Sequence, residues 1–322
     1  MGGAFRKADT PAAYPERMVD IGEDTLRSWV KPPSDHEDSK RDKTEAEIKS
    51  ALSASSRLQS VQYKVYAKGS YANNTNVRLD YDVDIAVECT EFCYYDVSPG
   101  ARSQKAEIDA QFHPYDKDYG LRAFKDDIEA ALVDFYGRSA VQRGNFALRV
   151  REKKTTLPAD VVPCCTFKSV TNIDRRGNLT SICGTRLRPD KGDDVTNWPQ
   201  QQLENGITKN DATNHRYKFM VRALKRLETE LVKEGLLKDE LPSFLIECLV
   251  YNVPDDSFNH ATYMDEMRAV LANIFNATLS DERCTEWVEV NWRKYLFRSS
   301  QPWTRSQAHT LADAAWNRLG FK

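Results

Sequence analysis

The sequence predicts an α+β protein with two lobes: a first half that combines strands with helices, and a second half that is mainly helical. Apolar residues alternate in several short runs of the first half, whereas in the second half they recur at the spacing of helices. Hydrophobic residues make up 40% of the chain and charged residues 29%, which is typical of a globular protein. A length of 322 residues suits one large domain or two lobes that share an interface.

The sequence of the first half of the chain predicts helices and strands in alternation. Ser34 is a suitable N-cap for a long charged helix, and Val61, Tyr63, Val65 and Ala67 alternate as a strand does. We expect an irregular N-terminal segment around a short amphipathic stretch, and a mostly looped segment over 94–119. The expected elements are the amphipathic stretch 21–30, helix 34–58, strand 61–67, turn 69–75, strand 82–87, helix 121–136, and strands 147–150 and 159–167.

The second half begins after a turn-rich stretch over 172–192. Its apolar residues follow helical spacing over 211–253, 264–274 and 308–319. We therefore expect a core over 1–180, which includes the long N-terminal helix, and a mainly helical lobe over 181–322.

Composition excludes several classes of protein. The formal net charge is −2, without the basic surplus of proteins that grip a duplex, so long double-stranded DNA is not expected as an obligate partner. No apolar run approaches the roughly 20 residues of a membrane span, and residues 1–20 lack the apolar core of a signal peptide, which predicts a cytoplasmic protein without a membrane partner. Seven cysteines, an odd number, do not indicate a disulfide framework. The common Walker, dinucleotide and zincin motifs do not occur.

Two acids in one predicted strand carry the first chemical signal. Asp82 and Asp84 are two residues apart and therefore point to the same face of a strand. Neighbouring carboxylates repel each other unless a cation lies between them, and Mg²⁺ binds through carboxylates together with substrate phosphates. The apolar run 85–87 that follows favours a core strand over a solvated edge.

Two further features support a phosphate-transfer site. Gly69 and Ser70 follow a predicted strand, and a glycine lets backbone amides approach a phosphate while a serine hydroxyl adds a donor. Asp160 enters the apolar strand 159–167, where a third carboxylate would complete a two-metal site for in-line displacement at phosphorus. Alternatively Asp160 is a loop acid or a helix-cap-like residue. If it pairs with a basic side chain on the far side of the sheet, another acid is needed, and Asp80 and Glu88 are the nearest in sequence.

Together these motifs resemble a known signature. The segments GSYANNT at 69–75, DVD at 82–84 and DVVP at 160–163 resemble DNA polymerase β-type nucleotidyltransferases, and more narrowly the bacterial cGAS/DncV-like nucleotidyltransferases of anti-phage CBASS systems. The segments 209–225 and 242–247 resemble the helical lobe of that family.

The resemblance implies a bilobed enzyme with a mixed-sheet core and a triphosphate in the cleft between its lobes. Asp82, Asp84 and Asp160 match the catalytic, metal-binding acids, with Mg²⁺ or Mn²⁺ as cofactor. Gly69, Ser70, Lys225 and Ser243 match nucleotide-binding positions. From the helix pattern alone, Lys225 is equally well a solvated lysine.

The implied function is condensation of nucleoside triphosphates, ATP, GTP or others, into a cyclic di- or oligonucleotide messenger in anti-phage defence. The resemblance also leaves room for regulatory proteins encoded nearby. Other functions open to the same fold are nucleotide addition to RNA ends, a small molecule or a protein, and a catalytically silent nucleotide sensor. Adjacent Cys164 and Cys165 have no histidine nearby, which argues against the zinc insertion of the animal DNA sensor. The basic run at Arg149, Arg151, Lys153 and Lys154 predicts a solvated strand edge.

Overall fold

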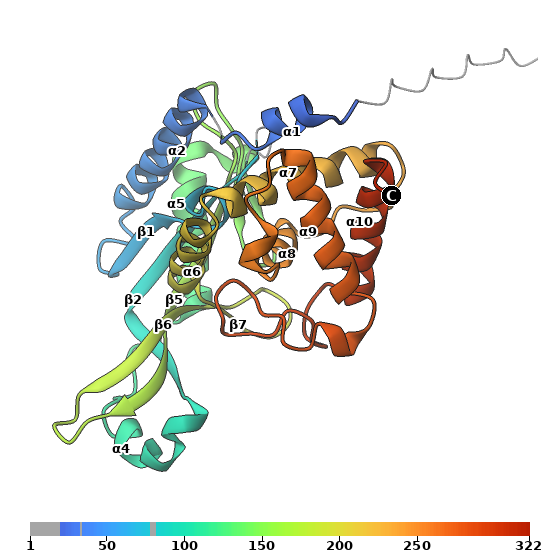
Figure 1. Ribbon diagram of the computed structural model, residues 1–322. Helices are drawn as coiled ribbons and strands as arrows, with labels where there is room; N and C mark the ends of the chain where they lie inside the picture. Colours follow the sequence, from blue (N-terminus) through green and yellow to red (C-terminus); the bar gives the residue numbers. More distant parts are fainter. Residues whose placement is uncertain (1–19, 33, 78–81) are drawn as a thin grey trace, which may run out of the picture.

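The computed structural model describes residues 20–32, 34–77 and 82–322, and Figure 1 shows its two lobes side by side. The predicted irregular segment up to residue 19 and the alternative acid Asp80 lie outside the described residues. The strands are β1 (Tyr63–Ala67), β2 (Val83–Val97), β3 (Val141–Arg143), β4 (Leu148–Val150), β5 (Ala159–Ile173), β6 (Leu179–Leu187) and β7 (Val195–Asn197). The helices are α1 (Glu23–Trp29), α2 (Asp35–Ser53), α3 (Gly69–Ala72), α4 (Lys105–Asp109), α5 (Leu121–Tyr136), α6 (Pro199–Ala212), α7 (Arg216–Lys233), α8 (Ser243–Tyr251), α9 (Tyr263–Ala277) and α10 (Arg305–Arg318), with short 3₁₀ turns between some of them.

The strands form one mixed sheet. β1 and β5 flank β2, antiparallel and parallel to it respectively. The other edge of β5 is shared, because β4 pairs with its start and β6 with its remainder; β3 extends the sheet from β4 and β7 extends it from β6. The central pair β2 and β5 therefore holds the sheet together.

Alternation along β2 and β5 gives the sheet two different faces. One face buries Val83, Ile85 and Val87 of β2 against α2 and α5, in a core that also includes Val161. The opposite face carries the intervening residues and is directed toward the helical lobe. This period of two decides which residues of β2 and β5 reach the space between the lobes.

The helical lobe has its own core. Its buried side chains come from α7, α8, α9 and α10, and α1 packs against α7 and α9 (Figure 1). The described part of the chain therefore begins with α1 on the helical lobe and crosses to the sheet in α2. The N-terminus of α2 is fixed as predicted, because Ser34 and Glu37 form a reciprocal capping box.

Most predicted elements are confirmed, and two loop predictions are wrong. α5 has the predicted bounds, and α9 and α10 lie within three residues of the predicted ones. The segment over 94–119 is not mostly loop, because β2 continues to Val97 and is followed by a 3₁₀ helix (Pro99–Gln104) and α4. Likewise the turn-rich stretch over 172–192 contains β6. These extensions are stabilised by pairing between β2, β5 and β6, which local sequence does not specify. The predicted division at residue 180 stays a prediction.

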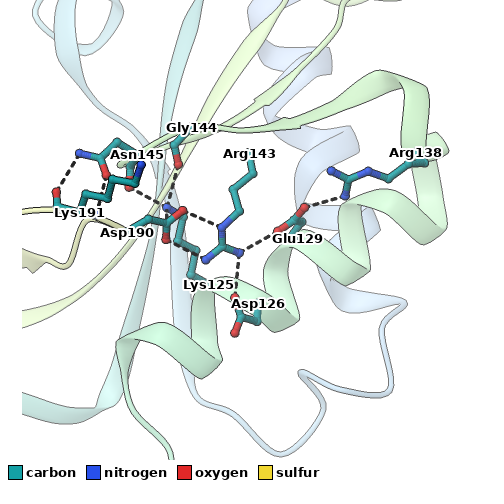
Figure 2. A network of polar contacts seen from close by, with 9 residues as sticks. All are labelled: Lys125, Asp126, Glu129, Arg138, Arg143, Gly144, Asn145, Asp190 and Lys191. Carbon is teal, nitrogen blue, oxygen red and sulfur yellow. Dashed lines mark hydrogen bonds and ion pairs between the residues drawn. The ribbon is translucent and has the colours of Figure 1, made fainter.

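A polar network around the buried Lys125 attaches the connection between β6 and β7 to α5 (Figure 2). The Lys125 amine of α5 donates to the carbonyl oxygens of Gly144 and Asn145 at 2.9 and 2.7 Å, and lies 3.1 Å from Asp190. Arg143 donates two hydrogen bonds to the same Asp190 carboxylate, each 2.8 Å long. Bidentate pairing of this kind fixes both distance and orientation, so the connection is held against the edge of the sheet.

Candidate active site

The predicted acids lie on the face of the sheet that is directed toward the helical lobe. Asp84 of β2 and Asp160 of β5 are direct partners in the parallel register, and Asp82 lies one residue before β2. Asp160 is therefore on a strand adjacent to Asp84, as its predicted role requires. Parallel pairing brings together two acids that are 76 positions apart in the chain.

Arg149 links two of these acids. Its Nη2 lies 2.8 Å from Asp82 Oδ2 and its Nε lies 3.3 Å from Asp160 Oδ1. It reaches them because Arg149 and Asp160 are register partners in β4 and β5, so their side chains share a face. The nearby charges of Asp160 and Asp82 raise the pKa of Arg149. The Arg149 side chain is 55% exposed on β4, as the prediction of a solvated strand position requires, and its guanidinium in addition neutralises part of the acid group.

Gly69 packs directly on Asp84. Its φ is +68°, and a Cβ atom built on it would lie 2.2 Å from Asp84 Oδ2. The adjacent Lys68 backbone N–H donates to the Asp84 carbonyl oxygen at 2.9 Å. Only glycine combines this left-handed backbone with so close an approach, so the turn and the acid form one unit.

The helical lobe supplies the opposite wall of a cleft of about 340 Å³. Lys225 of α7 and Ser243 of α8 line the cleft together with Gly69, Ser70 and the acids. Lys225 is only 4% exposed, and its Nζ donates to the Thr75 carbonyl oxygen at 3.0 Å, so it is not the solvated lysine that the helix pattern also allowed. All seven predicted site residues therefore border or adjoin one cleft; Asp160 adjoins it through Asp84.

Comparison with known proteins identifies the family of this chain. The helical lobe matches a family domain, and nearly the whole chain matches curated relatives. Residues 204–320 match the cGAS/DncV-like nucleotidyltransferase C-terminal helical domain. The cyclic dipyrimidine nucleotide synthase CdnE of Legionella pneumophila is 37% identical over 92% of this chain and 97% of its own length. The enzyme of the same name from Cecembia lonarensis is 34% identical over 94% of this chain and 100% of its own length. The chain belongs to the CdnE family of cGAS/DncV-like nucleotidyltransferases.

Solved structures of CdnE enzymes agree with this assignment. The structure of the Rhodothermus marinus c-UMP-AMP synthase with Apcpp and Upnpp has a TM-score of 0.77 and 30% identity, and the match covers 94% of this chain and 99% of that one. The structure of the Elizabethkingia meningoseptica cyclic dinucleotide synthase with GTP and Apcpp has a TM-score of 0.73 at the same identity. The predicted family, fold class and function are confirmed: this CdnE-family chain is a cyclic dinucleotide synthase with an α+β core and a C-terminal helical domain.

Several cleft residues were not identified from sequence. Glu247 of α8 is buried and accepts hydrogen bonds from the Thr75 hydroxyl at 3.1 Å and the Gln202 amide at 3.0 Å. Glu289 and Asn291, far along the chain, also line the cleft. Glu247 belongs to the family-like stretch 242–247, but nothing in the local sequence marks Gln202, Glu289 or Asn291.

The donor set of the three acids fits a hard divalent cation, because carboxylate oxygens are the ligands that Mg²⁺ takes from proteins. In the present arrangement the carboxylates of Asp82 and Asp160 do not converge on a common point; each pairs with the guanidinium of Arg149 instead. Across residues 20–32, 34–77 and 82–322, no three His, Cys, Asp or Glu side chains are grouped so that they could hold a metal ion. Holding a cation therefore requires the Arg149 side chain to move or the acids to turn.

None of the helices in the described part of the chain has both the length and the apolar character needed to cross a membrane.

Proposed function

We propose that this CdnE-family enzyme makes its cyclic dinucleotide in the cleft between the lobes, by a divalent-cation-dependent reaction at Asp82, Asp84 and Asp160. The observation that carries the proposal is the pairing of Asp84 with Asp160 across β2 and β5, with Gly69 packed on Asp84. Three acids on one face of a sheet, beside a glycine turn, are suited to hold a cation and a triphosphate together.

The acids would hold Mg²⁺ or Mn²⁺. When bound, such an ion supplies positive charge that acidifies the attacking hydroxyl and stabilises the leaving pyrophosphate. The remaining chemistry belongs to the chain: the carboxylate oxygens on this face are the acceptors available for the hydroxyl proton. Gly69 allows the turn to approach Asp84 closely, since a side chain there would collide with that carboxylate.

Lys225, Ser70 and Ser243 would bind the triphosphate. They line the cleft from both lobes, so one substrate can bridge the sheet and the helices. The Lys225 amine now donates to a backbone carbonyl, and a triphosphate oxygen is a stronger acceptor for the same cation. Electrostatic stabilisation of this kind works best in a site that excludes water, which agrees with the burial of Lys225.

The overall reaction balances as two nucleotidyl transfers. A ribose hydroxyl of one nucleotide attacks the α-phosphorus of another, a new P–O bond forms, the bond to the β-phosphate breaks, and pyrophosphate leaves. A second transfer, from the joined pair onto itself, closes the ring. The relatives are named for dipyrimidine, dipurine and UMP-AMP products. We therefore propose nucleoside triphosphates as the substrate class for this chain.

A product assay tests the proposal. The protein is incubated with each of the four labelled ribonucleoside triphosphates, singly and in pairs, with Mg²⁺, and the mixture is then treated with phosphatase. We expect a labelled product that resists phosphatase, because a cyclic dinucleotide has no terminal phosphate, and we expect a chelator to abolish it and Mg²⁺ or Mn²⁺ to restore it. Phosphatase-sensitive products alone would indicate the alternative reactions on another acceptor, and full activity in excess chelator would exclude the proposed role of the cation.

A further inference from the structure

A second cavity lies outside the catalytic cleft. It has a volume of about 680 Å³, is open to solvent, and is lined by the C-terminal half of α6, the end of α8 and the residues that follow it, and the segment 286–295. Cavities that hold small molecules are typically roughly 300–1,000 Å³. We call it the distal cavity.

Three aromatic rings line the distal cavity: Tyr251, Trp292 and Tyr295. Trp292 is 67% exposed and Tyr295 is 54% exposed, although rings of this size are usually covered. The Trp292 ring is held in place, because its Nε1 donates to the Tyr251 hydroxyl at 2.5 Å. Fixed, exposed aromatic faces are suited to stack on a planar ligand.

The backbone at Trp292 supports this interpretation. Its φ is +57°, in the left-handed region that a bulky side chain rarely adopts. A tight turn imposes this conformation: the Trp292 N–H donates to the Glu289 carbonyl oxygen at 2.9 Å, and the Glu289 N–H donates to the Lys294 carbonyl oxygen at 2.8 Å. Strain of this kind is concentrated at ligand-binding sites.

The polar lining of the cavity carries an excess of positive charge. Three basic residues, Lys209, Arg293 and Lys294, line the cavity, compared with two acids, Asp255 and Glu286. Asp255 already pairs with Lys209, whereas the Lys294 amine has the Thr196 carbonyl oxygen, at 2.6 Å, as its hydrogen-bond acceptor. An anionic group near Lys294 and Arg293 would therefore gain favourable charge interactions.

We propose that the distal cavity is a second nucleotide-binding site, in which a base stacks on Trp292 and phosphate lies near Arg293 and Lys294. Rings and cations on one wall match the two chemically different parts of a nucleotide. The source of the nucleotide is either a substrate triphosphate or the cyclic product. The proposal does not rest on the divalent-cation mechanism, since it concerns binding outside the catalytic cleft.

One short segment joins the two sites. Glu289 and Asn291 line the catalytic cleft, and the next residues, Trp292 to Tyr295, line the distal cavity. The Asn291 amide donates to Glu289 at 2.7 Å and the Arg293 backbone N–H donates to Asn291 at 2.8 Å, so the segment is internally bonded. A ligand that fixes Trp292 would also fix the cleft residues beside it, which makes the distal cavity a place where occupancy can affect synthesis.

Calorimetric titration tests the proposal. The probes are the non-hydrolysable analogues Apcpp and Upnpp and, separately, cyclic UMP-AMP, each titrated into the parent protein, Trp292→Ala and Lys225→Met. We expect at least one probe to bind Lys225→Met, whose catalytic cleft is impaired, and to lose about tenfold or more in affinity for the distal site in Trp292→Ala. Binding of the analogues would identify a substrate triphosphate, and binding of cyclic UMP-AMP would identify the product.

Phe146→Ala is the matched control, because Phe146 is also exposed but lies outside the distal cavity, and its titrations should equal those of the parent. Circular dichroism shows whether each variant folds. If Lys225→Met does not fold, the comparison of Trp292→Ala with the parent still shows whether a probe binds at the distal cavity. Equal affinities and equal numbers of sites in Trp292→Ala and the parent, or binding of none of the probes outside the cleft, would overturn the proposal. Either result leaves the product assay of the catalytic cleft unaffected.

Discussion

At the scale of single residues, charge decides which groups the acids of the candidate active site pair with. Asp82 and Asp160 share the guanidinium of Arg149, at 2.8 and 3.3 Å. Arg149 therefore occupies the electrostatic role that a divalent cation would take over. The acids and this arginine can be tested separately.

Neutralising two acids should remove activity without harming the fold. We expect Asp82→Asn together with Asp84→Asn to give no detectable product in the phosphatase assay, because carboxylates that await a cation contribute to its binding. The thermal unfolding temperature should not fall, since repulsion between the acids is relieved as well. Asp134→Asn, on the exposed side of α5, is the control. An unfolded double variant would point to a structural role for the acids.

Removing the competing arginine should strengthen cation binding. We expect Arg149→Gln to bind Mn²⁺ several-fold more tightly, because a positive charge in contact with two of the acids disfavours a second cation there. Titration of Mn²⁺ followed by electron paramagnetic resonance measures this without any turnover. Arg151→Gln, an exposed neighbour, should bind as the parent does. An unchanged Mn²⁺ affinity in Arg149→Gln would contradict the interpretation.

At the scale of elements, the short helix α3 and the strand β2 act as a unit. The left-handed Gly69 begins α3 and touches the Asp84 side chain, while Lys68 bonds to the backbone of the same aspartate. The geometry of the turn therefore sets the position of the acid.

A single added methyl group tests this unit. In Gly69→Ala the new Cβ would lie 2.2 Å from Asp84 Oδ2 in a backbone conformation unfavourable for alanine. We expect a loss of stability of about 1–3 kcal/mol and a loss of product formation of about 100-fold or more, measured by urea unfolding and by the product assay. Gly100→Ala, where a Cβ meets nothing within 4 Å, should behave as the parent. Normal activity of Gly69→Ala would show that Asp84 need not be fixed.

At the scale of the whole molecule, the network in Figure 2 joins α5, the turn between β3 and β4, and the connection that leads through β7 toward the cleft. Arg143 holds the pKa of Asp190 at about 2, below its ordinary value of 3.8, with Lys125 contributing. Because the folded-state pKa is depressed, the ionised carboxylate stabilises the fold above pH 3.8. That contribution is lost as the pH falls from 3.8 through about 2.

This linkage predicts a pH-dependent difference between two proteins. Asp190→Asn should be less stable than the parent at pH 5, and the difference should narrow as the pH falls toward 2, because protonation removes the charge from the parent as well. Urea unfolding at a series of pH values measures the stability of the variant and of the parent. Asp134→Asn, on the exposed side of α5, is the control for a general effect of removing an acid. A difference that does not change with pH would contradict the assignment to Asp190.

The sequence by itself determined the elements with strong local patterns and the residue types of the site. α5 and the capping box at Ser34 follow from apolar spacing and capping chemistry, which depend on neighbours in the chain. The spacing of Asp82 and Asp84, the nearby Gly69, and the resemblance that added Lys225 and Ser243 were likewise read from short stretches of sequence.

Only the tertiary structure decided how far the long strands extend and which residues lie beside the acids. The outer part of β2 and all of β6 exist because they pair with β5, and pairing energy depends on residues far away in sequence. The same long-range register places Arg149 beside Asp160 and Asp160 beside Asp84, and helix packing brings Glu247, Glu289 and Asn291 to the opposite wall. Arg149 is exposed, as its sequence suggests, but it is also a counter-ion of the acids because two strands align it with Asp160, and no local pattern encodes that alignment.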